Sequence, residues 1–321
     1  MKKYAIGVDL GGTKVLTGIV NTETGEILAV AKKKTQKADS ETIVDKIIGT
    51  IKKVLAQSEI PASEISSIGI GAAGQVDRKN GILMAAPNLN CYDLKLKDIV
   101  EEEFKIPVYV GNDVEVATIG EIMFGNGVGY KNLVCIFVGT GVGSGIVCNG
   151  RVHSGASGTA GEIGHIIVDT GGRLCGCGGN GCLEAYASRT AIEKRIVGAV
   201  KKGHGCVIKD LLQENSSIKS KHIKQALEMG DEVVFNSITE AAEYLSSGIA
   251  SVMNFFNPEV IILGGGLIEA IDFFFDITVK KSYAKALAIP AASTRIIRTG
   301  LKDFSGLTGA ALLEKYYQVS V

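Results

Sequence analysis

Proline, net charge and long apolar runs are all scarce in this sequence of 321 residues. The chain has 5 prolines, and 34 Lys and Arg residues balance 34 Asp and Glu residues, so its formal net charge is zero. Nucleic-acid-binding and membrane-surface proteins usually carry a basic surplus, which argues against both classes. The most apolar segments, 133–148 and 259–267, are short and are broken by glycine or flanked by charge, so no membrane span is expected.

An export signal is also missing from the sequence. Asp9 and Lys14 interrupt the stretch after Lys2 and Lys3 before the apolar region of a signal peptide can form. Hydrophobic residues make up 46% of the chain and charged residues 21%, which is typical of a globular protein. The sequence therefore predicts a cytoplasmic protein of about two domains.

Glycine is abundant, with 41 of 321 residues, or about 13% against a typical value of roughly 7%. Three glycine-rich turns follow strand-like segments, and free backbone N–H groups in such turns can bind phosphate. Neither a Walker A loop nor a strand–helix G-x-G-x-x-G fits them. One such turn is more often only a turn, but three at strand ends favour nucleotide binding. The turns comprise Gly11, Gly12 and Thr13, flanked by Asp9 and Lys14; Gly139, Thr140, Gly141, Val142 and Gly143; and Gly264, Gly265 and Gly266.

The chain contains an internal repeat. Segment 4–34 alternates β-rich runs with turn signals and predicts three antiparallel strands, and segment 132–153 has the same plan. Aligning IGVDLGGTK with IFVGTGVGS pairs Asp9 with Gly139 and Lys14 with Ser144, so only the first copy keeps charged groups. The repeat predicts a duplicated fold in which the two copies have different tasks.

The remaining pattern is a mixture of helices and strands. We expect the first domain to comprise residues 1–112 and a C-terminal helix at about 305–321, and the second to comprise 113–304. Helices are expected at 40–57, 95–104, about ten residues from 113, 185–202, 232–257 and after GLTG at 306–309, and buried strands at 65–73, 106–111 and 258–266.

Asn112 and Asp113 lie where a predicted apolar strand ends and a helix begins. Both residue types are preferred helix N-caps, and capping alone would explain the pair. The end of a buried strand is also where α/β proteins place catalytic groups, and a carboxylate there can act as general base toward a hydroxyl. The residues themselves leave both interpretations open.

The segment 155–184 holds the densest group of candidate ligands. His165, Cys175, Cys177 and Cys182 match the Cys₃His donor set of a closed structural zinc site, and the intervening glycines let the chain wrap around an ion. Such a site leaves no position for a catalytic water, so zinc would act as a clamp. The alternative is a group of reduced, buried thiols.

The motifs together resemble the ROK family, closest to its bacterial glucokinase branch. The resemblance covers nearly the whole chain in order, and its cysteine motif is the most specific part. It is carried by VDLGGTK at 8–14, GND at 111–113, GTGVGSG at 139–145, EIGH at 162–165, CGCGGNGCLE at 175–184 and PEVIILGGG at 258–266.

The resemblance implies an actin-like ATPase fold, a duplicated ribonuclease H-like α/β fold of two domains with ATP and a sugar in the interdomain cleft. It assigns Asp9, Gly11, Gly12, Thr13 and Lys14 to a first phosphate loop, with Asp9 helping to hold Mg²⁺. The other assignments are a second phosphate loop at Gly139, Thr140, Gly141 and Gly143, and an adenosine site at Gly264, Gly265 and Gly266.

The resemblance further implies ATP-dependent phosphorylation of glucose at the 6-hydroxyl, with Asp113 as general base. Asn112, Glu162, His165 and Glu184 would contact sugar hydroxyls, with Gly74 and Gln75 on the opposite wall. His165 would also bind structural Zn²⁺ with Cys175, Cys177 and Cys182.

Other members of the family define the alternatives. These are a kinase of another hexose such as N-acetylmannosamine or N-acetylglucosamine, a sugar-responsive repressor, and a sugar-binding regulator without turnover. The repressor branch has a winged-helix domain before the first phosphate loop, which here begins at residue 9. The expected partners are a sugar, ATP and a second copy in a homodimer or homotetramer, with no nucleic acid and no membrane.

Overall fold

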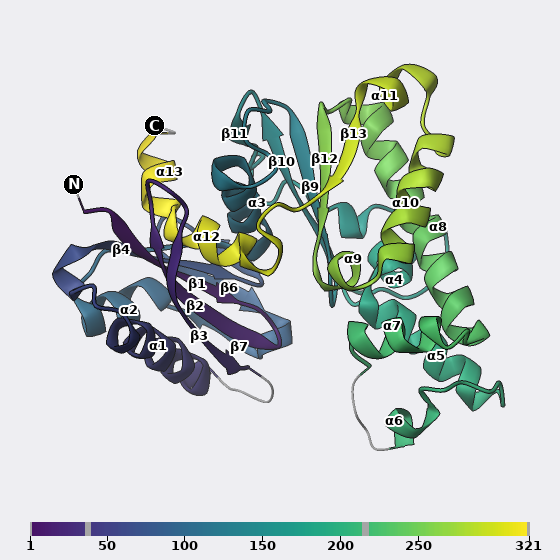
Figure 1. Cartoon of the computed structure of the whole chain (residues 1–321), viewed down its shortest axis with the longest axis horizontal. Helices are drawn as coiled ribbons and strands as arrows, with labels where there is room; N and C mark the ends of the chain where they lie inside the picture. Colours follow the sequence, from purple (N-terminus) through teal and green to yellow (C-terminus); the bar gives the residue numbers. More distant parts are fainter. Residues whose placement is uncertain (1, 36–39, 214–217, 320–321) are drawn as a thin grey trace. The chain divides into compact units, whose positions relative to one another are not determined.

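The computed structural model describes residues 2–35, 40–213 and 218–319 (Figure 1). Its contacts divide the chain into two units. Unit 1 comprises Met1–Tyr130, Asn149–His153 and Thr299–Val321, and unit 2 comprises Lys131–Cys148 and Ser154–Arg298. Among the described helices, none is both long and apolar enough to span a membrane.

Unit 1 is built on a five-stranded sheet of order β3-β2-β1-β4-β8. As predicted, the first three strands are antiparallel neighbours: β1 (Tyr4–Leu10), β2 (Lys14–Asn21) and β3 (Ile27–Lys34). β4 (Ile65–Ala72) and β8 (Val108–Asn112) then add in parallel to β1. The carboxyl ends of β1, β4 and β8 therefore lie on one edge of the sheet.

Helices cover both faces of this sheet (Figure 1). α1 (Ser40–Gln57) and α2 (Leu96–Phe104) pack against one face, where Ile6, Val8 and Leu10 of β1 are fully buried. α12 (Ser305–Ala311) packs against the other face through Leu307. Because side chains alternate along a strand, Asp9 points to the face of α12, where its carboxyl lies close to Gly306.

α12 approaches the sheet so closely that several contacts admit only glycine. A Cβ atom on Gly69 would lie 1.7 Å from the Ala310 carbonyl oxygen, and one on Gly7 would lie 1.9 Å from that of Leu307. α3 (Asp113–Phe124) packs on α12 in the same way, because a Cβ on Gly309 would lie 1.7 Å from the Val116 carbonyl oxygen. These glycines serve close packing rather than turns.

The other elements of unit 1 are short. A three-stranded sheet has the order β5-β6-β7. The segments are η1 (Ala62–Glu64), β5 (Gln75–Asp77), β6 (Ile82–Ala86), η2 (Pro87–Leu89), β7 (Cys91–Leu94), η4 (Lys302–Phe304) and α13 (Leu313–Val319).

The second five-stranded sheet has the order β11-β10-β9-β12-β13, which matches the first strand for strand and confirms the internal repeat. β9 pairs antiparallel with β10 and parallel with β12, as β1 does with β2 and β4. The strands are β9 (Leu133–Val138), β10 (Val142–Cys148), β11 (Arg151–Val152), β12 (Val260–Gly264) and β13 (Arg295–Arg298).

In unit 2 a large apolar core joins β9 and β12 to the long helix α8 (Glu232–Phe256) and to its neighbours. The helix expected at 185–202 is broken at Ser188, whose hydroxyl caps the second piece by accepting from the N–H of Ala191 at 3.1 Å. The remaining segments are η3 (Ile163–His165), α4 (Glu184–Ala187), α5 (Arg189–Lys201), α6 (Lys209–Gln213), α7 (Ser220–Glu228), α9 (Gly266–Ala270), α10 (Asp272–Lys285) and α11 (Ala288–Ser293).

Two sequence expectations differ from the structure. The units change at Tyr130 rather than at residue 112, because α3 packs on α12 and stays with the first sheet. The C-terminal helix expected at about 305–321 is present as α12, which begins at Ser305, and α13, but α12 contains GLTG at 306–309 rather than following it.

Candidate active site

In unit 1 the structure brings Asp9 and Asp113 to the same edge of the sheet. The strand register pairs Asp9 with Gly71 and Gly71 with Gly111, so Asp9 is level with the last residues of β8. Asp113 follows directly as the first residue of α3. The two carboxylates were predicted as separate motifs, and the parallel order of the strands makes them neighbours.

The electrostatics of this edge favour a cation. Burial, followed by the charge of Asp113, raises the pKa of Asp9 from 3.8 to about 7, with a smaller contribution from Asp303. Lys14 opposes this shift because its positive charge favours the ionised carboxyl. Oxygen ligands of this kind suit Mg²⁺, which usually binds through one or two carboxylates and the phosphates of a substrate. Asp9 therefore fits the predicted role in holding Mg²⁺.

The first glycine turn, residues 11–13, connects β1 to β2 beside Asp9. It is closed by a hydrogen bond from the N–H of Gly11 to the carbonyl of Lys14 at 3.0 Å. The Thr35 hydroxyl donates to the Gly11 carbonyl at 3.1 Å, and the Thr35 N–H donates to the Thr13 carbonyl at 3.0 Å. The turn is thus fastened to the end of β3, while the Thr13 side chain stays exposed.

Asn112 is a helix cap and also a link to a second segment. Its Oδ1 accepts from the N–H groups of Val114 at 3.0 Å and Glu115 at 3.2 Å, which confirms the capping interpretation. Its Nδ2 donates to the carbonyl of Gly74 at 3.0 Å. This bond holds the segment with Gly74 and the exposed Gln75 beside α3, so three of the predicted sugar-contacting residues are neighbours.

In unit 2 the second glycine turn, residues 139–143, connects β9 to β10. A hydrogen bond from the N–H of Gly139 to the carbonyl of Gly141 closes the turn at 2.9 Å. The third glycine turn, residues 264–266, follows β12, which lies beside β9. Gly265 has a φ of 91°, and a Cβ there would lie 2.6 Å from the backbone of Val138. Both turns therefore meet at one edge of the second sheet.

Arg189, which belongs to none of the predicted motifs, contacts the second glycine turn. Its Nη2 donates to the Thr140 hydroxyl at 2.9 Å, and its backbone N–H donates to the Gly139 carbonyl at 2.9 Å. The adjacent Thr190 hydroxyl donates to the Thr140 carbonyl at 2.8 Å. Ser188, a preferred helix cap, is the local signal that Arg189 begins a helix. The contact of Arg189 with Thr140 depends on the fold and has no local signal.

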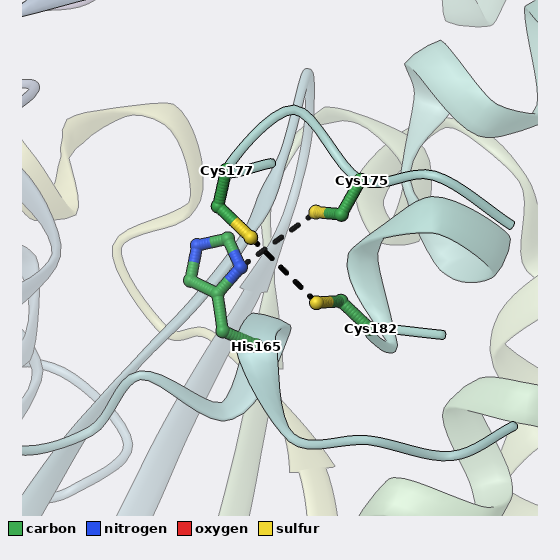
Figure 2. A group of neighbouring side chains, drawn as sticks. All are labelled: His165, Cys175, Cys177 and Cys182. Carbon is green, nitrogen blue, oxygen red and sulfur yellow. Dashed lines mark hydrogen bonds between the residues drawn. The ribbon is translucent and has the colours of Figure 1, made fainter. Parts of the chain in front are cut away.

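The predicted metal ligands form one cluster (Figure 2). The ligand atoms of His165, Cys175, Cys177 and Cys182 all lie within 4.8 Å of one another. The Sγ atoms of Cys177 and Cys182 are 3.7 Å apart, and Cys175 Sγ is 3.7 Å from His165 Nδ1. A tetrahedral zinc with bonds of about 2.3 Å to sulfur needs edges of about 3.8 Å, so the donor set and its spacing fit Zn²⁺.

The local backbone brings these ligands together. Gly181 has a φ of 78°, and a Cβ there would lie 1.8 Å from the Asp169 carbonyl oxygen. The glycine thus allows the tight bend that carries Cys182 back toward Cys177.

The other predicted sugar contacts of unit 2 lie close in sequence to the ligands of this metal cluster. Glu162 precedes η3 and has an exposed side chain, while His165 ends that turn. Glu184 begins α4, two residues after Cys182. The Ser144 hydroxyl donates to the Gly161 carbonyl at 2.6 Å, which fastens the segment of Glu162 to β10. The structure therefore groups Glu162, His165 and Glu184 near the start of β10.

Two sheets of the same strand order, each with glycine turns at one edge, define a duplicated α/β fold of the actin-like ATPase type. The chain belongs to the ROK family, whose model matches residues 5–316. It is 37% identical to a glucokinase from Streptomyces coelicolor, over 97% of each chain. It is 32% identical to a glucokinase from Thermotoga maritima, over 98% of each chain.

Among solved structures, a ROK family glucokinase from Streptomyces griseus in complex with glucose and AMPPNP superposes with a TM-score of 0.83. The two sequences are 35% identical, over 97% of this chain and 98% of that one. Family and fold, predicted from the motifs, are thus confirmed by sequence and structure alike.

Proposed function

We propose that this protein transfers the γ-phosphoryl group of ATP to the 6-hydroxyl of glucose. The proposal rests on the pair of carboxylates at one sheet edge, where burial and then the charge of Asp113 raise the pKa of Asp9. Asp9 can then bind a cation while Asp113 accepts a proton. The similarity to glucokinases over 97% of the chain supports the choice of reaction and sugar.

In this proposal Asp113 accepts the proton of the 6-hydroxyl as its oxygen forms a bond to the γ-phosphorus. The bond from that phosphorus to the bridging oxygen breaks, and ADP leaves with the electron pair. Phosphoryl transfer needs positioning and charge neutralisation more than covalent help from the protein. Mg²⁺, held with the help of Asp9, would neutralise phosphate charge when bound.

The glycine turns bind the nucleotide in this proposal. The N–H groups of Gly11, Gly139 and Val142 donate within the chain. We therefore assign phosphate binding to the backbone of Gly12 and Thr13, with Lys14, and of Thr140 and Gly141, while residues 264–266 lie along the adenosine. Arg189 holds Thr140 of the second glycine turn in place, with the guanidinium only partly exposed.

Sugar hydroxyls are bound by Asn112, Glu162, His165 and Glu184 in this proposal. Gly74 and Gln75, which were expected opposite Asn112, lie beside it instead, because Asn112 donates to the Gly74 carbonyl. The metal cluster orders the segment that carries Glu162 and Glu184, so zinc acts as a structural clamp on sugar binding. Because hexoses differ by only a few contacts, a panel of sugars is needed to test the preference for glucose.

The direct test compares wild-type protein with Asp113→Asn. We expect kcat to fall by about 10²–10⁴, because the base is lost, while the Kd for glucose changes little. Asp45→Asn, on the exposed side of α1, is the matched control and keeps full activity. Full activity of Asp113→Asn would remove this residue from its role.

The accompanying panel measures ADP release with glucose, mannose, N-acetylmannosamine and N-acetylglucosamine. Glucose should give the highest kcat/KM. A higher kcat/KM for an N-acetyl sugar would make that sugar, and not glucose, the substrate. Absence of turnover with every sugar would indicate a regulator without kinase activity.

We further propose a cytoplasmic location and a homodimer or homotetramer. Light scattering on the purified protein measures the oligomeric state.

A further inference from the structure

Arg78 and Glu115 form an ion pair beneath the proposed sugar site. Arg78 follows β5 directly, and Glu115 is the third residue of α3, two positions after Asp113. Arg78 Nη2 lies 2.7 Å from Glu115 Oε2, and the side chains are 27% and 9% exposed. Neither residue belongs to a motif of the sequence analysis, and neither has a part in the proposed phosphoryl transfer.

Stability alone does not account for this pair. Burial raises the pKa of Glu115 to about 7, although Arg78 opposes the shift. Removing two charges from water costs about as much as their attraction returns, so buried ion pairs are often neutral for folding or worse. The ion pair of Arg78 and Glu115 is therefore better explained by the segments that it holds in position.

The pair acts together with a second link between the same two segments. Asn112 donates from Nδ2 to the carbonyl of Gly74 and accepts the N–H of Glu115 at Oδ1. The first turn of α3 therefore holds one end of β5 at Gly74 and the other end at Arg78. Both links lie within unit 1, where the strand between them begins at Gln75.

The turn that carries Arg78 is itself fixed. Asn80 donates to the Asp77 carboxylate from Nδ2 at 2.7 Å and from its backbone N–H at 3.2 Å. At the other end of β5, Gly74 has a φ of 149°, and a Cβ there would lie 2.3 Å from the Ala85 carbonyl oxygen. A rigid hairpin held at two points can set the position of a backbone wall to a fraction of an ångström.

We propose that Arg78 and Glu115 are positioning residues that hold the wall formed by Gly74 and Gln75 at a fixed distance from Asn112 and Asp113. This inference rests on the proposed function, because it assigns the pair to the binding of the sugar. It predicts a loss of sugar affinity, with nucleotide binding unaffected.

The experiment measures kcat, the KM values for glucose and ATP, the Kd for glucose and the thermal midpoint at pH 8 for four variants. These are Glu115→Gln, Arg78→Gln, the double variant and Arg78→Lys. Glu103→Gln is the control, because Glu103 of α2 forms an ion pair in the same unit with Lys52 of α1 at 2.5 Å and contacts neither Arg78 nor Glu115 through it. Amide hydrogen exchange across 72–86 reports the hairpin directly.

For Glu115→Gln and Arg78→Gln we expect the KM and Kd for glucose to rise about tenfold or more, with the KM for ATP within about twofold of wild type. The double variant should be no worse than either single one, and Arg78→Lys should recover part of the affinity. Glu115→Gln should keep or raise the thermal midpoint, and exchange across 72–86 should quicken.

Unchanged glucose affinity and unchanged exchange in both single variants would overturn the inference while leaving the kinase function intact. Equal losses for glucose and ATP, together with a lowered thermal midpoint, would also overturn it in favour of a purely structural role. A wild-type protein that phosphorylates no sugar would refute the proposed function instead, and hydrogen exchange would then decide whether the pair fixes the hairpin.

Discussion

Glu184 links the metal cluster to the second glycine turn. Its Oε2 accepts the backbone N–H of Val142 at 2.9 Å, and its Oε1 lies 3.9 Å from Cys175 Sγ. A Cβ on Gly141 would lie 2.3 Å from Oε2, so the turn can approach this carboxylate only because it has glycine there. One side chain thus joins the proposed zinc, sugar and nucleotide contacts of unit 2.

This linkage predicts that the metal is needed for activity. Elemental analysis should find one zinc per chain in wild-type protein, and Cys177→Ala should lose it together with at least tenfold in glucose affinity. Cys148→Ala, on β10 outside the metal cluster, should keep both. A zinc-free preparation with full activity would contradict the role of the cluster.

The contact between Arg189 and Thr140 predicts a selective effect on nucleotide binding. Arg189→Ala frees Thr140 from the start of α5, so the KM for ATP should rise about fivefold to twentyfold, as for loss of a charged hydrogen bond. The KM for glucose should stay near the wild-type value. Lys194→Ala, an exposed position on the same helix, is the control, and equal effects on both substrates would argue against the assignment.

The raised pKa of Asp9 predicts a pH-dependent cost to stability. Between the ordinary pKa of 3.8 and about 7, the folded protein retains a proton that the unfolded chain has lost. The free energy of unfolding therefore falls as pH rises through this window. Asp9→Asn removes the effect, so it should raise the thermal midpoint by about 2–5 °C at pH 8 and by little at pH 4.

The activity of Asp9→Asn should change in the opposite direction to its stability. Asp9→Asn should be nearly inactive, although it is more stable at pH 8, because it has lost a carboxylate for the cation. Mg²⁺ should narrow the stability difference by binding the wild-type protein. If the two proteins have parallel stability profiles from pH 4 to pH 8, the shifted pKa is refuted.

The glycines beneath α12 predict a large packing penalty. Gly309→Ala places a methyl group against the Val116 carbonyl oxygen, which backbone movement must relieve, so we expect a loss of about 3 kcal/mol or more in the free energy of unfolding. Gly198→Ala, within α5 and with no atom within 4 Å of its Cβ position, should instead stabilise by about 0.5–1 kcal/mol. Urea unfolding of both variants measures the difference.

Local patterns predicted the strands of segment 4–34, the repeat and the members of the metal cluster. Each of these depends on residues near one another in sequence, such as the spacing of Cys175, Cys177 and Cys182. The repeat could also be predicted because alternation and turn signals recur in the same order along both copies.

Contacts across long sequence distances were not accessible in the same way. Glu121 was no candidate, yet its buried carboxylate accepts from the N–H groups of Asn126, Gly300 and Leu301 and from the Ser305 hydroxyl. Arg78 with Glu115, and Arg189 with Thr140, likewise become partners only once sheets and helices are placed. The last helix was expected after GLTG rather than through it, because a local pattern does not report the backbone that approaches these glycines.

The position of α12 in unit 1 also affects how the protein is made. Asp9 and the face of the first sheet on which α12 packs are translated early. α12 itself, residues 305–311, is translated nearly two hundred residues after β8 ends. At ribosomal speeds that interval is on the order of ten seconds or more. The first sheet to leave the ribosome is therefore among the last to be completed, and one of its faces stays uncovered until α12 has been made.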